Sequence, residues 1–199
     1  GMHSSGLNAS MIRQFEEDTV FIPYAVEGAN FVRKLSEDGK LEFKNVGSLI
    51  LFKDGRIDSI KSAISFGEKY GLSSEIIAKD DVLKKVSLLK GADFDKAVWT
   101  ISDGIVDINQ FLWGYLRSAT AKGAKLITKE SVVDISRGQK SKVRGQNFVV
   151  KTERNVFEAK YIVNATGAWA GEIGKMANAS NIELIPFRRH LYNTQAMKE

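Results

Sequence analysis

The chain has 199 residues, of which 43% are hydrophobic and 27% are charged, and its formal net charge is +5. These values are typical of a soluble globular protein with one sizeable core or two small ones. The sequence has no cysteine and only two histidines, His3 and His190. It therefore excludes disulfides and thiolate metal sites, and it argues against a histidine metal site.

No apolar run approaches the length of about 18 residues that crosses a membrane, and residues 1–20 carry no apolar leader segment. We therefore expect a cytoplasmic protein without a membrane span. The excess of positive charge suits an anionic ligand such as a dinucleotide or a carboxylate, but a lysine-rich solvated surface explains it better. The basic residues are spread along the chain without a basic and aromatic stripe, so we expect no nucleic-acid partner.

The first 36 residues predict a loop followed by a helix. Residues 3–10 are small and polar and predict the loop. Asp18 or Thr19 is suited to cap a helix that runs to about Ser36, and Pro23 must then lie in its first turn. Four residues at helical spacing predict its core face: Tyr24, Phe31, Val32 and Leu35. The acidic residues 16–18 are best explained as a solvated helix start, the alternative being a site for a substrate ammonium group.

Residues 38–103 predict a mixture of strands and helices. Asp-Gly turns at 38–39 and 54–55 bound two strands, at residues 41–43 and 48–52. A helix marked by Ile57, Ile60 and Ile64 stops at Gly71. A short helix at residues 80–86 and a strand at residues 97–101 complete this part.

Residues 107–159 predict a helix followed by four strands. Asp107 is a good N-cap with Gln110 as its capping-box partner, and Gly123 suits the end of the helix. A strand at residues 124–128 would make this a crossover unit of a parallel sheet. Residues 131–135, 148–152 and 156–159 then predict a three-stranded meander.

The most informative stretch of the chain is residues 161–174, which read Tyr-Ile-Val-Asn-Ala-Thr-Gly-Ala-Trp-Ala-Gly-Glu-Ile-Gly. Its start predicts a strand that is buried on both faces, as in a parallel sheet, and residues 169–176 predict a helix. The small residues Ala165, Gly167 and Ala168 between them let a flat or phosphorylated cofactor approach the backbone. An ordinary strand-to-helix junction is the alternative.

Three further stretches make a resemblance specific: residues 3–10, residues 103–109 (Asp-Gly-Ile-Val-Asp-Ile-Asn) and residues 186–190 (Pro-Phe-Arg-Arg-His). In order and spacing, the chain resembles the FAD-dependent amino-acid oxidoreductases, which include glycine and sarcosine oxidases and D-amino-acid oxidases and dehydrogenases. The D-amino-acid dehydrogenase branch is the most similar. The resemblance implies FAD and oxidation at a carbon that bears an amine or a hydroxyl.

The resemblance also implies a fold of the mixed α/β class. It predicts an incomplete Rossmann-like FAD-binding domain with the three-stranded meander, formed by residues 1–18 and 104–179. Residues 19–103 and 180–199 would form part of an inserted substrate-binding domain with an antiparallel sheet and helices.

Site residues follow from the resemblance as well. The cofactor-binding set is Ser4, Ser5, Asn8, Ala9, Val132, Ala165, Gly167 and Trp169. Arg188 or Arg189 would hold the substrate carboxylate over the flavin, since an arginine fork binds a carboxylate bidentately. The alternatives are a frayed terminus at residues 3–10, an ordinary strand residue at Val132 and a surface basic pair at the arginines. No catalytic residue is assigned.

The sequence departs from the family by lacking the G-x-G-x-x-G turn that holds the FAD pyrophosphate. It resembles a middle fragment without that N-terminal unit and without the C-terminal part, so we expect FAD to be absent or weakly bound in this chain alone. Two functions stay open. One is part of an enzyme that transfers a hydride from an amino acid or 2-hydroxy acid to flavin. The other is a non-catalytic binding or interaction domain. We expect a homo-oligomer or a complementing N-terminal fragment as partner.

Overall fold

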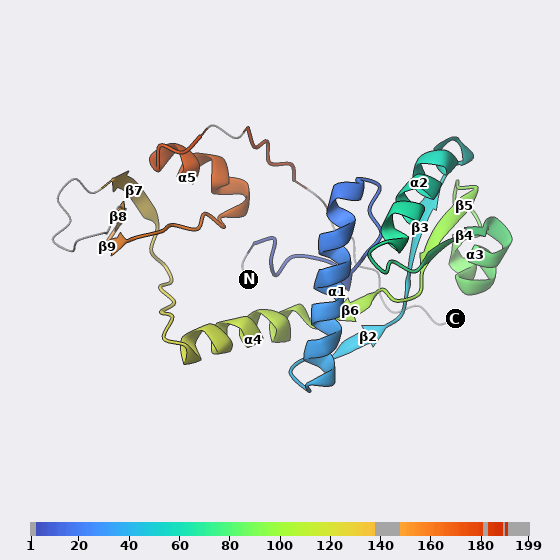
Figure 1. Ribbon diagram of the computed structural model, residues 1–199, viewed down its shortest axis with the longest axis horizontal. Coiled ribbons are helices and arrows are strands. Elements are labelled where there is room, and N and C mark those ends of the chain that lie inside the picture. The colour runs from blue at the N-terminus through green and yellow to red at the C-terminus, as the bar shows by residue number, and fades with distance from the viewer. Residues whose placement is uncertain (1–2, 138–147, 181–182, 189, 191–199) are drawn as a thin grey trace. The chain divides into compact units, whose positions relative to one another are not determined.

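The computed structural model describes residues 3–137, 148–180, 183–188 and 190 (Figure 1). Contacts divide the chain into two compact units, Gly1–Ala119 and Thr120–Glu199. Three antiparallel sheets of three strands each, together with helices, confirm the predicted mixed α/β class. No helix in the described part of the chain is both long and apolar enough to cross a bilayer.

The central sheet of the first unit contains β3 (Ser48–Phe52), β4 (Ser74–Ala78) and β5 (Lys96–Thr100). β5 lies in the middle and pairs antiparallel with both neighbours, so that Val98 faces Ile50 on one side and Ile76 on the other. β4 was not predicted from the sequence, because its pair of isoleucines is a weak signal beside the long helix before it.

Helices cover both faces of this sheet (Figure 1). Successive strand residues point to opposite faces, so Val98 packs with α1 (Ile22–Glu37) and α2 (Ile57–Glu68), whereas Ala97 packs with α3 (Lys79–Lys85) and the short helix η3 (Ser87–Leu89). The larger cluster consists of Phe15, Ile22, Val26, Phe52, Ile60, Ala63, Leu72 and Val98. Each large apolar side chain buried there contributes about 1.5–3 kcal/mol.

The start of α1 follows the prediction. Asp18 Oδ1 accepts a hydrogen bond from Val20 N (3.2 Å), which caps the turn η1 (Thr19–Phe21), and Pro23 lies in the first turn of the helix. The predicted core face is wrong in part, because Tyr24 is 73% and Phe31 45% exposed. The helix turns a neighbouring face to the sheet, and its buried residues are Ile22, Val26, Ala29 and Val32.

A second sheet of the first unit contains β1 (Met11–Ile12), β6 (Gly104–Val106) and β2 (Phe43–Asn45) in that order. Its core joins Val106 to Val32 of α1 and to Leu41, with Phe111 packed against them. The strand predicted at residues 41–43 thus begins two residues later, and β1 and β6 were not predicted. The predicted domain boundary at 103/104 falls between β5 of one sheet and β6 of the other, whereas the boundary at 18/19 falls between β1 and α1. The domain assignment stays a prediction.

Helix α4 (Ile108–Ala121) follows β6 and begins at the predicted cap. Asp107 Oδ1 accepts hydrogen bonds from the backbone nitrogens of Asn109 (2.8 Å) and Gln110 (3.1 Å). These bonds satisfy two of the donors that every helix start leaves free. The helix ends just before Gly123, as predicted.

The second unit contains the predicted meander of β7 (Val132–Arg137), β8 (Phe148–Thr152) and β9 (Val156–Ala159). Helix α5 (Ala170–Met176) follows the turn η4 (Gly167–Trp169) and contacts β7.

Two predicted strands of the second unit are wrong. Residues 124–128 and 161–165 form no strand, and Tyr161 and Val163 are 85% and 88% exposed. A parallel strand needs neighbours that accept and donate its backbone hydrogen bonds, and the described part of the chain provides none for residues 161–165. Residues 183–188 also form no strand.

Candidate functional site

The predicted cofactor-side loop at residues 3–10 is confirmed as a loop with a defined internal structure. Asn8 organises it, because its Nδ2 donates to the carbonyl oxygens of Ser4 (3.3 Å) and Ser5 (3.0 Å), and its Oδ1 accepts from Ser10 N (2.7 Å). The side chains of Ser4, Ser5 and Asn8 are exposed. The amide of Asn8 is therefore engaged within the loop, while the two serine hydroxyls face solvent.

The turn around Gly167 is built by a side chain to which the sequence analysis gave no role. Asn164 Nδ2 donates to the Ala170 carbonyl (2.9 Å), and its Oδ1 accepts from Thr166 Oγ1 (2.7 Å). These bonds join the end of the extended segment to the start of α5. Gly167 has a φ of +59°, and no described atom stands within 4 Å of the place where a Cβ would lie. The backbone of this turn is open to a ligand on that side.

Val132 and Trp169 lie in the same unit as this turn. Val132 begins β7, pairs with Thr152 and is half-buried, which is what an ordinary strand residue would also do. Ala165 and Trp169 are exposed. These positions leave the predicted cofactor contacts of all three residues open.

Glu130, two positions before Val132, is a polar residue that was not singled out from the sequence. Its Oε1 accepts hydrogen bonds from Thr152 Oγ1 and from Asn155 Nδ2 (2.7 Å). The hydrogen bond from Thr152, followed by that from Asn155, holds the pKa of the Glu130 carboxyl below its ordinary value. The carboxylate thus fastens the turn between β8 and β9 to the start of β7.

The two predicted substrate-binding arginines are described only in part. Arg188 is exposed and lies outside regular structure, and Arg189 lies outside the described residues. The candidate site residues therefore fall into two groups. Ser4, Ser5, Asn8 and Ala9 belong to the first unit, and all the others belong to the second.

Hollows occur in both units. One of about 550 Å³ in the second unit is lined by Asn164, Gly171, Lys175 and Asn178, so its walls offer amides and a cation. Another of about 430 Å³ in the first unit lies between α1 and α4 and is lined by Phe31, Phe111, Tyr115 and Arg117. Both volumes are in the range of small-molecule sites.

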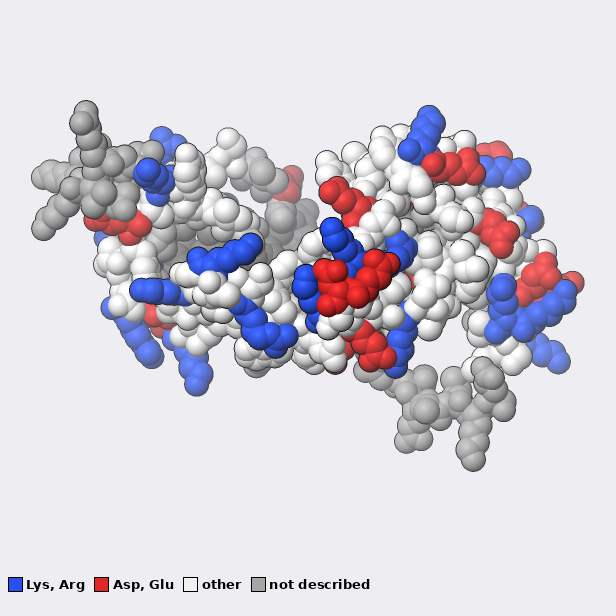
Figure 2. All heavy atoms as spheres, turned by 60° about the horizontal axis from the view of Figure 1, so that its bottom comes forward, with Lys and Arg blue, Asp and Glu red and all other residues white. Residues whose placement is uncertain are grey.

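The acidic residues predicted to start α1 are engaged within the protein. Glu16 pairs with Arg13 (2.6 Å), Glu17 pairs with Arg56, and Asp18 caps η1. These contacts favour the predicted solvated helix start over an ammonium site. Over the first unit, Figure 2 shows acidic and basic side chains interspersed, without a stripe of one sign on that face. No group of three potential metal ligands occurs among the residues that the structure describes.

Comparison with known proteins identifies the family of this chain. The family described as FAD dependent oxidoreductase matches residues 1–199. The mitochondrial sarcosine dehydrogenase of Mus musculus is 27% identical over 154 residues, which are 73% of this chain and 16% of that protein. The glycerol 3-phosphate dehydrogenase of Caloramator mitchellensis is 25% identical over 161 residues, which are 80% of this chain and 32% of that protein.

A solved structure agrees with this result. The L-proline dehydrogenase from P. horikoshii superposes with a TM-score of 0.72 and 26% identity, over 84% of this chain and 44% of that chain. The chain thus spans less than half the length of each of these three relatives.

Proposed function

Because the chain belongs to the FAD dependent oxidoreductase family, we propose that it forms part of an enzyme that oxidises a small amino acid or 2-hydroxy acid. The observation that carries the proposal is the family match over all 199 residues. The sequence resemblance drawn from four separate stretches is confirmed by that match.

The residues present fit FAD in part. The serine hydroxyls of residues 4 and 5 face solvent, and the open side of Gly167 admits a flat group to the backbone. The set that would hold the cofactor is Ser4, Ser5, Asn8, Ala9, Val132, Ala165, Gly167 and Trp169. When bound, FAD would supply the acceptor for the hydride that leaves the substrate α-carbon. The 199 residues contain no G-x-G-x-x-G turn, so this chain alone offers few donors to a pyrophosphate.

The substrate class follows from the relatives and from the arginines. Two relatives are named for amino acids, sarcosine and L-proline, and one for glycerol 3-phosphate. We place an amino acid first, with its carboxylate on Arg188 or Arg189, and a hydroxy acid second. The names of the relatives favour a secondary amine over the D-amino-acid branch that the sequence suggested.

A flavin titration tests the cofactor. The protein is titrated with FAD while flavin fluorescence is followed, first alone and then with a fragment that supplies the βα fingerprint unit of a relative. We expect little flavin after purification and saturable binding once the fragment is present. Binding in neither case would reject the cofactor role.

Kinetics on the reconstituted enzyme test the substrate. Reduction of an artificial acceptor is followed with sarcosine, L-proline, D-alanine and glycerol 3-phosphate. Removing a carboxylate partner from a dry site costs a few kcal/mol, so we expect Arg188→Ala or Arg189→Ala to lower kcat/KM by about a hundredfold or more. Lys125→Ala serves as a control that removes an exposed cation from the same unit. Unchanged kinetics in both arginine variants would remove them from the site.

A non-catalytic interaction domain is the second candidate function. The exposed apolar side chains of Tyr161 and Val163 favour it, on a segment whose backbone groups have no partner among the described residues. A homo-oligomer or a complementing N-terminal fragment is the partner that such a segment would take. We keep the cytoplasm as the proposed location.

A further inference from the structure

The first unit contains a buried carboxylate that none of the functions above uses. Asp103 has no exposed surface, and its side chain accepts three hydrogen bonds. Its Oδ1 accepts from the backbone N (3.1 Å) and the Nε2 (2.8 Å) of Gln14, and its Oδ2 accepts from Ser48 Oγ (2.6 Å). Gln14 and Ser48 are themselves buried. Among the described residues, no lysine or arginine forms an ion pair with Asp103, so neutral donors hold it.

These three residues lie beside the ends of strands in both sheets. Gln14 follows β1, Ser48 opens β3 just after β2, and Asp103 stands between β5 and β6. The backbone of Asp103 also takes part, because its carbonyl accepts from Gly47 N (2.8 Å) and its N donates to the Thr100 carbonyl (3.3 Å). Asp103 thus bonds to the segment that follows β1 and to both connections between the sheets.

The residue after Asp103 fixes the register at this point. Gly104 lies opposite both Ile12 of β1 and Asn45 of β2. A Cβ on Gly104 would stand 2.3 Å from the Lys44 carbonyl oxygen, so the strands approach too closely for any other residue. The backbone that follows Asp103 is thus held closely against its neighbouring strands.

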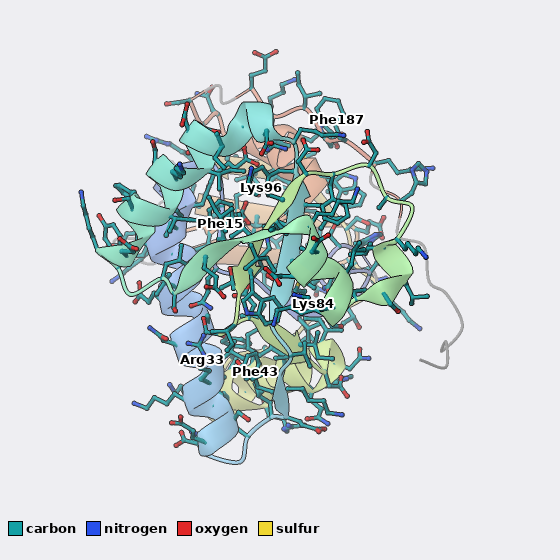
Figure 3. All side chains as sticks on the ribbon, turned by 90° about the vertical axis from the view of Figure 1, so that its right-hand side faces the viewer. Phe15, Arg33, Phe43, Lys84, Lys96 and Phe187 are labelled. Carbon is teal, nitrogen blue, oxygen red and sulfur yellow. The ribbon has the colours of Figure 1, made fainter. Side chains whose placement is uncertain are left out.

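Helix α1 contacts the residue directly before Asp103. Arg33 donates through one guanidinium nitrogen to the Ser102 carbonyl (2.8 Å), and its guanidinium lies 6.0 Å from the centre of the Phe43 ring. Figure 3 shows Arg33 on α1 close to Phe43. The guanidinium thus holds the backbone directly before Asp103.

We propose that Asp103 is a positioning residue that holds the loop at residues 3–10 in a fixed place relative to the sheet of β3, β5 and β4. The loop is bonded directly to β6, since Ser10 O accepts from Val106 N (2.9 Å). The loop also leads straight into β1. The inference rests on the proposed function for what the loop binds, namely the cofactor. It does not depend on that function for the coupling itself.

Native-state amide exchange of the full chain tests the coupling. In Asp103→Ala the buried donors of Gln14 and Ser48 lose their acceptor. We expect exchange of the Gln14 and Gly47 amides and of the peptide covering residues 3–14 to accelerate about tenfold or more. The amides of β5 should change less. Thr100→Val is the matched control, because it removes an equally buried hydroxyl whose partner, Ser74 Oγ at 2.6 Å, lies within the central sheet.

Asp103→Asn separates positioning from charge. Its carboxamide oxygen still accepts from Gln14, and its nitrogen can donate to Ser48 Oγ, so we expect near-parental exchange of the loop. If Asp103→Ala does not fold, Ser48→Ala removes one of the three hydrogen bonds. It should selectively accelerate exchange of the Gly47 amide. Uniform acceleration of both sheets in the folded variant, or Asp103→Asn as labile as Asp103→Ala, overturns the proposal.

Flavin binding by the same variants is a second, independent measurement. With the complementing fragment present, Asp103→Ala should weaken FAD binding, and Asp103→Asn and Thr100→Val should not. If the parent protein binds no FAD, the proposed function fails while the exchange experiment still decides the coupling.

Discussion

Single side chains hold the turns of this protein by forming hydrogen bonds with groups close by in sequence or space. Asp107 caps α4, Asn164 ties the Gly167 turn to α5, and Glu130 joins β7 to the turn after β8. Ion pairs such as that of Arg13 with Glu16 lie on the surface, where each contributes at most about 1 kcal/mol. Variants at the accepting side chains should therefore have larger effects than variants at surface charges.

Glu130 makes a pH-dependent contribution to the folding stability of the second unit. Its pKa is lowered in the folded protein by the hydrogen bonds of Thr152 and Asn155. The contribution is therefore present above the pKa of the unfolded chain and is lost as the pH falls through the folded pKa. We expect Glu130→Gln to reduce the loss of stability between about pH 5 and pH 3. Urea midpoints across this range measure it, with Glu172→Gln as a control for removing one carboxylate. Parallel pH profiles of parent and Glu130→Gln would contradict the role.

Substitutions at Gly167 can distinguish an effect on backbone conformation from an effect on the approach of a ligand. Its φ of +59° strains most side chains, at a cost of about 1–2 kcal/mol, while asparagine tolerates this region. With the complementing fragment present, we expect Gly167→Val to lower the thermal midpoint modestly and FAD binding strongly. Gly167→Asn should keep the midpoint and still weaken FAD binding, because a side chain then occupies the open side. Normal flavin content in Gly167→Asn would show that the glycine serves the turn alone.

At the scale of elements, the sequence predicted those that carry their own local signals. α1 and α4 were predicted because a capping aspartate, an early proline or a terminal glycine marks their ends. β1 and β6 were missed because strands of two or three residues have no readable alternation. Residues 161–165 were mistaken for a buried strand, since an apolar β-branched run says nothing about whether neighbours exist to pair with it.

The same limit applied to the candidate site. The motif at residues 103–109 was recognised, but the partners of Asp103 could not be, because Gln14 and Ser48 are brought to it only by the crossing of two sheets. Asn164 and Glu130 are polar residues in turns, and nothing in their spacing marks the hydrogen bonds that they accept.

The cap of α4 provides a test at this scale. Asp107→Ala removes the acceptor for the Asn109 and Gln110 amides and should cost about 0.5–2 kcal/mol of stability. Asp107→Asn keeps an acceptor and should retain most of it. Amide exchange at residues 109 and 110 reports the cap directly, and urea unfolding gives the free energy. Equal exchange in Asp107→Ala and the parent would show that the helix start does not need the side chain.

At the scale of the whole chain, the exposed segment at residues 161–165 predicts association. Symmetric pairing of two copies would satisfy both sets of unpaired backbone groups at once. We expect light scattering at micromolar concentration to give a dimer or larger species, and Val163→Lys to shift it toward the monomer. Lys160→Ala is a control for a change of charge beside the segment. A monomeric parent with residues 161–165 protected from exchange would show that the chain covers this segment itself.

The strand order of the first unit has a consequence for how the protein is made. In both of its sheets the central strand is synthesised last, since β5 and β6 follow β3, β4, β1 and β2 along the chain. On the ribosome, β3 therefore waits without a partner for roughly 2–10 seconds at ordinary elongation rates. During that interval its apolar residues are available to other nascent chains and to chaperones. Both sheets are then completed by one stretch of eleven residues, Lys96 to Val106, whose emergence from the exit tunnel commits the whole unit to fold.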